Sequence, residues 1–193
     1  MRVIGGQAKG HRLRVPSLAG LRPTSDRVRE AVFDVLESRG LVEGAAVLDL
    51  FAGSGALGIE ALSRGAASAV FVESDRRAAR AIEENLTVLG PIGGRGRVVR
   101  AQVVSFLSGG ATADVALVDP PYSFGEWAVL LELLAGTVEI AVLEHTGALE
   151  LAPHFETLRA YRHGGTLVTV VTEASAPGPV EPVGERPDEE LRR

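Results

Sequence analysis

The sequence predicts an α/β fold in which helices cover both faces of a mostly parallel sheet. Between residues 46 and 144, apolar runs that suit buried strands alternate with segments of helical periodicity. A glycine-rich turn, residues 53–58, follows the first of these runs, where a parallel strand passes into a helix. Near the C-terminus two apolar runs have no helix between them, so we expect a closing antiparallel pair and seven strands in all.

The elements of this repeat follow one another at short spacing. Strands are expected at residues 46–51, 69–73, 97–101, 115–118 and 139–144, and the closing pair at 155–162 and 166–172. Helices are expected at residues 56–64, 75–89 and 126–134, with a short turn at 105–107 and Asp75 as a helix cap.

The N-terminal part is predicted to hold a small hairpin and one more helix. Short alternating runs flank the glycines at positions 5, 6 and 10, which indicates a hairpin within residues 2–15. Ser25 suits a helix N-cap, and apolar residues then recur at helical spacing to about Ser38. We therefore divide the chain into an N-terminal arm (1–21), a main domain (22–173) and a tail (174–193) whose composition predicts disorder.

Composition excludes several classes of protein. The 193 residues are 46% hydrophobic and include no cysteine, which excludes disulfides and thiolate metal sites or nucleophiles. The four histidines are scattered, so no metal is expected. No window approaches the apolar length of a membrane span, and there is no apolar signal core. We expect a soluble, cytoplasmic monomer.

Charge is unevenly distributed along the chain. The first 29 residues hold seven basic side chains and one acid, Asp26, a net charge of +6, so the remainder carries −11 of the total of −5. A basic arm on an acidic body is typical of polyanion binding, although a merely solvated surface has the same composition.

The glycine turn is the first candidate ligand site. Glycines at a strand-to-helix turn let the backbone approach a ligand, and the helix N-terminus offers free amides. Asp49 lies inside the preceding apolar strand, where a carboxylate needs a partner: a ligand cation or amine, or the amides of the turn itself. Glu73 ends the next strand and could accept both hydroxyls of a ribose. These features fit NAD as well as other nucleotide cofactors.

A second candidate site is the Asp-Pro-Pro-Tyr sequence at residues 119–122, after the fourth strand. In a doubly wound sheet this strand lies beside the first, so both motifs open on one crevice. A carboxylate, a rigid backbone carbonyl and an aromatic plane can hold an exocyclic amine and stack on its ring. The alternative is a rigid turn with a half-buried tyrosine.

Together these motifs resemble S-adenosylmethionine-dependent N-methyltransferases with a Rossmann-like fold. The resemblance rests on Asp-Leu-Phe-Ala-Gly-Ser-Gly at residues 49–55 with Asp-Pro-Pro-Tyr at 119–122. The segments 2–6 and 22–30 narrow it to the RsmD family, bacterial enzymes that methylate N2 of a guanine (position 966) in 16S ribosomal RNA. The resemblance covers residues 2–171 and implies S-adenosylmethionine as cofactor and the small ribosomal subunit or an assembly intermediate as partner.

The resemblance also implies roles for single residues. The base site would comprise Asp119, Pro120 and Tyr122. The cofactor site would comprise Asp49, Phe51, Gly53, Ser54, Gly55, Glu73, Ser74, Gln102, Val103 and Asp119. RNA contacts would come from Arg2, Lys9, His11, Arg12, Arg14, Arg22, Arg27 and Arg29. Gln102 departs from the Asp or Asn that such enzymes commonly place near the adenine, so backbone groups at Val103 would contribute more.

Three alternatives remain open at this point. A DNA adenine-N6 methyltransferase shares the pocket chemistry, and only the N-terminal segment favours ribosomal RNA. An NAD-dependent oxidoreductase keeps the glycine turn but leaves Asp-Pro-Pro-Tyr unexplained. A non-catalytic RNA-binding protein predicts RNA binding without methyl transfer.

Overall fold

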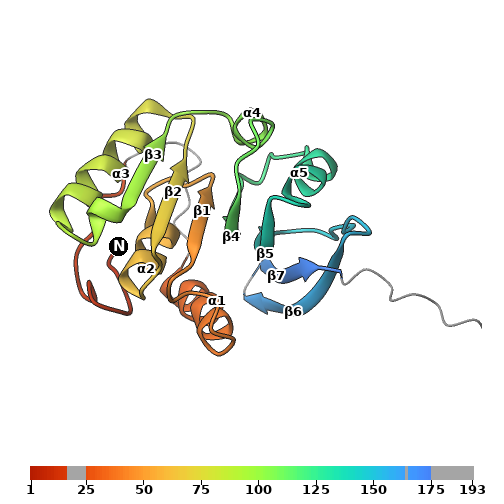
Figure 1. Cartoon of the computed structure of the whole chain (residues 1–193), viewed down its shortest axis with the longest axis horizontal. Helices are drawn as coiled ribbons and strands as arrows, with labels where there is room; N and C mark the ends of the chain where they lie inside the picture. Colours follow the sequence, from red (N-terminus) through yellow and green to blue (C-terminus); the bar gives the residue numbers. More distant parts are fainter. Residues whose placement is uncertain (17–24, 164, 175–193) are drawn as a thin grey trace, which may run out of the picture.

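The chain forms one seven-stranded sheet with helices packed on both faces (Figure 1). The computed structural model describes residues 1–16, 25–163 and 165–174. The strand order is β3-β2-β1-β4-β5-β7-β6, and β7 runs antiparallel to the other six strands. The strands are β1 (Ala46–Leu50), β2 (Ser68–Val72), β3 (Gly96–Val99), β4 (Ala113–Val118), β5 (Val138–His145), β6 (Phe155–His163) and β7 (Thr166–Glu173).

Within the described residues, five α-helices connect or precede these strands. They are α1 (Asp26–Glu37), α2 (Ala56–Ser63), α3 (Arg76–Val88), α4 (Val103–Leu107) and α5 (Trp127–Leu134), and a single 3₁₀ turn covers Gly93–Arg95. The two predicted caps are confirmed: the Ser25 hydroxyl accepts from Val28 N at 3.3 Å, and the Asp75 carboxylate accepts from Arg77 N and Ala78 N. The predicted fold class, a Rossmann-like sheet with an antiparallel last strand, is confirmed.

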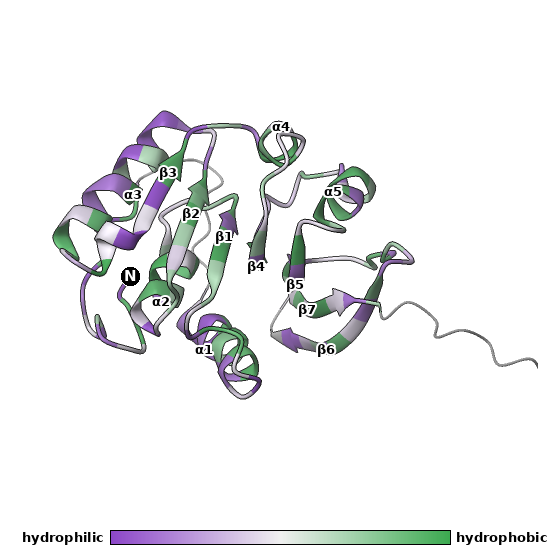
Figure 2. Ribbon diagram, in the orientation of Figure 1, coloured by the Kyte–Doolittle hydropathy of each residue, from purple (hydrophilic) through white to green (hydrophobic). Residues whose placement is uncertain are grey.

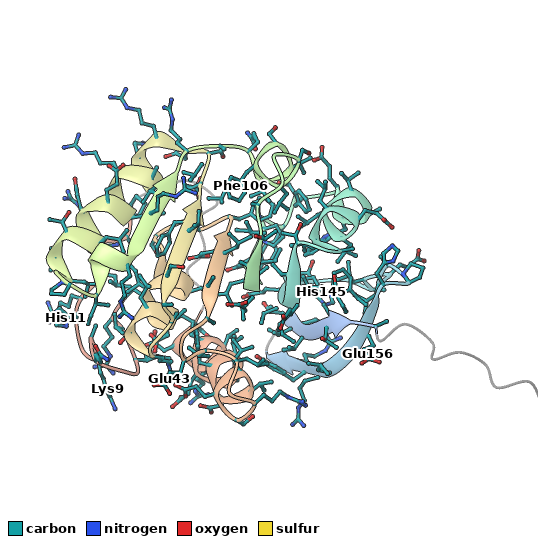
Figure 3. All side chains as sticks on the ribbon, viewed as in Figure 1. Lys9, His11, Glu43, Phe106, His145 and Glu156 are labelled. Atoms are coloured by element: carbon teal, nitrogen blue, oxygen red, sulfur yellow. The ribbon has the colours of Figure 1, made fainter. Side chains whose placement is uncertain are left out.

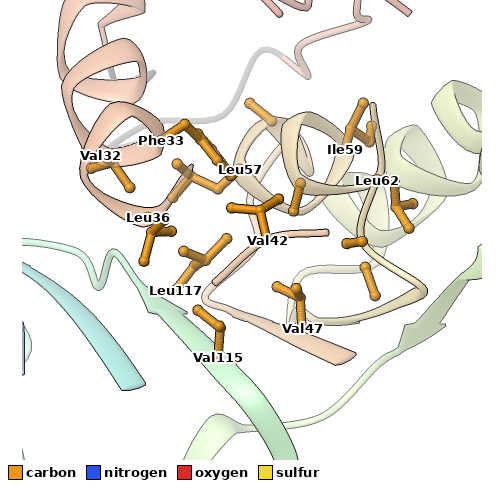
Figure 4. Packing of buried hydrophobic residues seen from close by; sticks show 14 of the residues in the cluster. Val32, Phe33, Leu36, Val42, Val47, Leu57, Ile59, Leu62, Val115 and Leu117 are labelled. Atoms are coloured by element: carbon orange, nitrogen blue, oxygen red, sulfur yellow. The ribbon is translucent and has the colours of Figure 1, made fainter. Parts of the chain in front are cut away.

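Alternate residues of each strand supply two separate cores. One face packs against α1, α2 and α3, and its core includes Phe33, Leu57 and Leu117 (Figure 4). The other face packs against α4 and α5 through residues such as Leu50 and Leu131. The central strands are therefore apolar on both sides, as the continuous runs in the sequence predicted. Figure 2 shows the polar residues on the outer surfaces of the helices, α3 most clearly.

The N-terminal segment is packed against α2. Its predicted hairpin pairs through one antiparallel bridge, Arg2 with Arg12, flanked by a hydrogen bond from Val3 N to His11 O at 2.9 Å. Val3, Ala8 and Leu13 are buried in the core that faces α2. This segment therefore contributes to the core as well as presenting basic side chains.

A buried carboxylate holds this segment in place. Glu60 of α2 is fully buried, and its two oxygens accept from Ile4 N at 2.9 Å and Gly5 N at 2.7 Å. Its Oε1 atom also accepts from Arg64 Nε at 2.9 Å, and Arg64 pairs in turn with Glu37 of α1.

In the described part of the chain, no helix is long and apolar enough to cross a membrane.

Candidate active site

A cleft of about 1250 Å³ opens where the parallel strands end. Leu50 of β1 lies opposite Val118 of β4, so the glycine turn and Asp-Pro-Pro-Tyr begin at neighbouring strand ends. Both motifs line the cleft, together with the ends of β2 and β5 and the start of α4. The structure thus brings together the two stretches that the sequence placed on one crevice.

The glycine turn adopts backbone conformations that favour glycine. Gly53 and Gly55 have φ values of 56° and 78°, and Phe51 has a φ of 62° although it carries a side chain. A bulky residue in this region costs on the order of 1–3 kcal/mol and is typical of functional sites. Gly58 serves packing: a Cβ there would lie 2.4 Å from Phe71 Cε1.

Asp49 is buried beneath the turn, and its Oδ2 atom accepts from Gly58 N at 2.8 Å. Burial raises the pKa of Asp49 well above its usual range, the Gly58 hydrogen bond opposes this shift, and the charges of Asp119 and Glu73 add to it. The sequence allowed two partners for this carboxylate, a ligand cation or amine and the amides of the glycine turn. The structure shows the second, the amide of Gly58. The carboxylate also lines the cleft, so it remains available to a ligand cation.

Glu73 connects the turn to the end of β2. Its Oε2 atom accepts from Gly53 N and its Oε1 atom from Asp75 N, both at 2.8 Å. Each carboxylate oxygen keeps further acceptor capacity, so a ribose hydroxyl can still bind. Its place at the cleft wall suits the predicted ribose contact, which stays a prediction.

The loop predicted to form the base site is held against the glycine turn by aromatic rings. Pro120 is buried, whereas Tyr122 is 61% exposed at the cleft. Phe124 N donates to Pro121 O at 2.8 Å, and the Phe124 ring meets Phe51 edge-on with centroids 5.0 Å apart. Trp127 continues this row at 5.5 Å from Phe124. The loop that would receive the base therefore packs directly on the strained residue of the cofactor turn.

Four more of the predicted cofactor residues, Ser54, Ser74, Gln102 and Val103, also line the cleft, whereas Gly55 does not. Ser54 is buried, and its backbone oxygen accepts from Asn85 Nδ2 at 3.1 Å. Ser74 and Gln102 are exposed, and Val103 is buried at the start of α4. The Gln102 side chain makes no capping hydrogen bond to α4, so its amide can turn toward a ligand.

The predicted RNA-binding residues are more dispersed than a single arm would suggest. Lys9 and His11 lie near the lower end of α3, away from the strand tips where the cleft opens (Figure 3). This position follows from the contact of Gln7 N with Ser63 O, at the C-terminal end of α2. Exposed side chains are found at Arg2, Lys9, His11, Arg12, Arg14 and Arg27. Arg22 lies outside the described residues.

The assignment of Arg29 to RNA binding is wrong. Its side chain is fully buried, and its Nη2 atom donates to Arg2 O at 2.8 Å and to Asp26 Oδ1 at 2.6 Å. The physical reason is helical spacing: Arg29 lies on the face of α1 that carries Val32, Phe33 and Leu36 into the core. Arg29 was assigned to RNA binding with the other basic residues of the N-terminal segment, and that grouping did not take its burial into account.

Sequence reasoning also missed several contributors to the cleft. Met1 lines it, and Ser54 Oγ lies 3.6 Å from Met1 Sδ. Phe124 and Arg77 line it as well. Phe124 could have been identified because it lies two residues after Tyr122 in the sequence, and Arg77 because it lies four residues after Glu73.

Asp49→Asn should make the protein more stable at neutral pH. Because the fold raises the pKa of Asp49, the unfolded chain releases this proton above about pH 3.9, the ordinary value, more readily than the folded protein does. Ionisation therefore favours unfolding above that pH, and the effect disappears below it. We expect a higher free energy of urea unfolding for the variant at pH 8 and no difference at pH 3.5. A variant that is less stable at pH 8 would contradict this balance between burial and the Gly58 hydrogen bond.

Fold and site together define the class: this is a Rossmann-like methyltransferase fold with its two signature loops on one cleft. Residues 1–172 match the model of the family described as Conserved hypothetical protein 95, and the chain belongs to that family. The identification with the RsmD family made from the sequence is confirmed.

Named relatives agree with this membership. The Escherichia coli (strain K12) protein named "Ribosomal RNA small subunit methyltransferase D" is 47% identical over 126 residues, which are 65% of this chain and 62% of that protein. The Bacillus subtilis "Putative rRNA methyltransferase YlbH" is 35% identical over 172 residues, 87% of this chain and 90% of that one. The structure described as "Putative methyltransferase yhhF from Escherichia coli" superposes with a TM-score of 0.80 and 35% identity, over 91% of this chain and 99% of that chain.

Proposed function

We propose that this protein transfers a methyl group from S-adenosylmethionine to the N2 amine of a guanine, position 966, in 16S ribosomal RNA of the small subunit. The observation that carries the proposal is the placement of the glycine turn and Asp-Pro-Pro-Tyr at adjacent strand ends of one cleft. The relatives whose names specify ribosomal RNA support the class of substrate. With such a substrate, the protein would act in the cytoplasm, and we propose a monomer.

The charge of the cleft fits a cationic cofactor. The described residues that line it include five acids, Glu73, Asp75, Asp119, Glu126 and Glu144, and one arginine, Arg77; a sixth acid, Asp49, also lines it, but its burial disfavours the charged form. A sulfonium and an α-amino group are attracted to such a lining, whereas the pyrophosphate of a dinucleotide is repelled. The amides of Gly53 and Gly58 already donate to Glu73 and Asp49, which further disfavours a phosphate at this turn. Asp49, Glu73 and Gln102 would hold the cofactor.

S-adenosylmethionine supplies a methyl group that its sulfonium already activates. The task of this chain is to make the guanine amine a nucleophile, because its lone pair is delocalised into the ring. Hydrogen bonds from the amine to the Asp119 carboxylate and the Pro120 carbonyl would localise that lone pair and direct it at the methyl group. Positioning of this kind is worth roughly 7 kcal/mol or more in well-oriented systems. Asp119 would then accept the released proton.

The target guanine must leave its stack to enter the cleft. Tyr122, with 61% of its surface exposed at the rim, offers a stacking plane that returns about 1–3 kcal/mol per base. The acidic lining keeps the phosphate backbone outside the cleft, so only the base would enter.

Calorimetry tests the cofactor assignment directly. We expect S-adenosylhomocysteine to bind and NADH not to bind, and tight NADH binding alone would contradict the proposal. Methyl transfer measured in parallel on ribosomal RNA and on DNA separates the proposal from its nearest alternative, an adenine-N6 methyltransferase. Incorporation into DNA adenine without incorporation into RNA would favour that alternative.

A further inference from the structure

We propose that an exposed arginine strip along α3 binds the RNA phosphates that flank the target guanine. The strip comprises Arg14, Arg76, Arg77, Arg80 and Arg100. One member of the strip, Arg77, lines the cleft. Lys9 and His11 lie near the lower end of α3, away from the cleft (Figure 3). The inference rests on the proposed function and names the surface by which that site would hold its RNA.

Contacts within the protein make this strip continuous. Arg14 comes from the N-terminal segment and Arg80 from α3, and both guanidinium groups pair with Glu84. The backbone of Arg14 is fixed there, because Asn85 Oδ1 accepts from its N–H at 2.7 Å and Asn85 Nδ2 donates to its carbonyl at 3.0 Å. The same Nδ2 atom donates to Ser54 O in the glycine turn. Asn85 therefore connects the backbone of Arg14 to the glycine turn.

The upper end of the strip reaches the cleft. Arg77 lines the cleft, and Ala101 N donates to Glu73 O at 3.2 Å, which places the preceding Arg100 beside the start of α3. From Arg77 to Glu84 the helix rises about 10 Å. Blue-tipped side chains extend from this outer side of α3 in Figure 3.

Helix stability does not explain these charges. Arg76 and Arg77 occupy the first turn of α3, which has no acid after its Asp75 cap. Cations are unfavourable at a helix N-terminus because the helix dipole is positive there. The side chains of Arg77 and Arg80 are 72% and 77% exposed, and exposed ion pairs contribute little to stability. The chain as a whole has a net charge of −5, so a basic strip stands out on it. Positive side chains in this strip are complementary to the negative phosphates of an RNA whose base enters the acidic cleft.

The test compares two variants that each lose two exposed positive charges. Arg76→Gln/Arg80→Gln removes charges from the strip. Arg39→Gln/Arg159→Gln removes them from the turn that follows α1 and from β6, which forms the edge of the sheet opposite β3. Binding to unmodified small ribosomal subunits is measured from 50 to 300 mM salt, together with S-adenosylhomocysteine binding and methyl transfer.

We expect the strip variant to bind the subunits about tenfold more weakly at low salt, with a slope of log K against log salt smaller by roughly 1.5. Its S-adenosylhomocysteine affinity and its kcat at saturating subunits should equal those of the wild type, and the control variant should bind as the wild type does. Equal affinity and equal salt slope in the two variants would overturn the proposal. If the wild-type protein binds the subunits but transfers no methyl group to them, the proposed function is refuted. The salt slopes of the two variants would still decide the role of the strip.

Discussion

Asp119→Ala is expected to reduce methyl transfer by at least about 100- to 1000-fold while S-adenosylhomocysteine binds nearly as before. The reason is that the substitution removes an acceptor that would hold the reacting amine, and loss of one preorganised electrostatic partner has effects of that size in other enzymes. Single-turnover transfer to unmodified small subunits measures the change, and calorimetry measures cofactor binding.

Glu126→Ala is the matched control for this experiment. Glu126 lines the same cleft and carries the same charge, but it is exposed at the start of α5 and makes no capping hydrogen bond. We expect it to lower transfer less than tenfold. Near-normal turnover in Asp119→Ala, or an equal loss in both variants, would show that Asp119 is not the group that holds the amine.

Glu60→Ala should have the largest effect on stability. The fully buried carboxylate is the acceptor for Ile4 N, Gly5 N and Arg64 Nε, and Arg64 is itself only 9% exposed. Removing one partner of a buried ion pair costs about 3–5 kcal/mol, because the other charge and the amides lose their acceptor. Urea unfolding measures this loss, and hydrogen exchange should localise it to residues 3–8 and the end of α2.

Two further variants keep this prediction testable if Glu60→Ala does not fold. Glu60→Gln retains an acceptor oxygen and should lose less stability. Glu84→Ala removes an exposed partner of Arg14 and Arg80 and should change stability by less than about 1 kcal/mol. A Glu60→Gln protein as stable as Glu84→Ala would contradict the anchoring role of Glu60.

The strands of the sheet could be predicted because the sequence signals that specify them are local. Buried parallel strands read as continuous apolar runs, and the glycine turn and caps are short-range signals, so all seven strands and both signature loops were predicted near their observed positions. The missing helix between β6 and β7 correctly indicated the antiparallel strand.

Three features of the structure were not predicted from the sequence. Glu60 was not singled out, and its partners Ile4 and Gly5 come from more than 50 residues away. Arg29 belongs to a basic segment, but the packing face of α1 buries it. The backbone strain at Phe51 likewise depends on a fold in which Phe124 packs against its ring. The helical periodicity of α1 does place Arg29 on the apolar face, whereas no periodicity in the sequence specifies the contacts of Glu60 and Phe51.

The most direct test of the proposed function is methyl transfer to small ribosomal subunits that lack the modification. The subunits are incubated with the protein and S-adenosylmethionine carrying a labelled methyl group, and the modified nucleotide is then mapped. We predict one labelled N2-methylguanine in 16S ribosomal RNA, at position 966. Label on another nucleotide, or no transfer by a protein that binds S-adenosylhomocysteine, would contradict the proposed function.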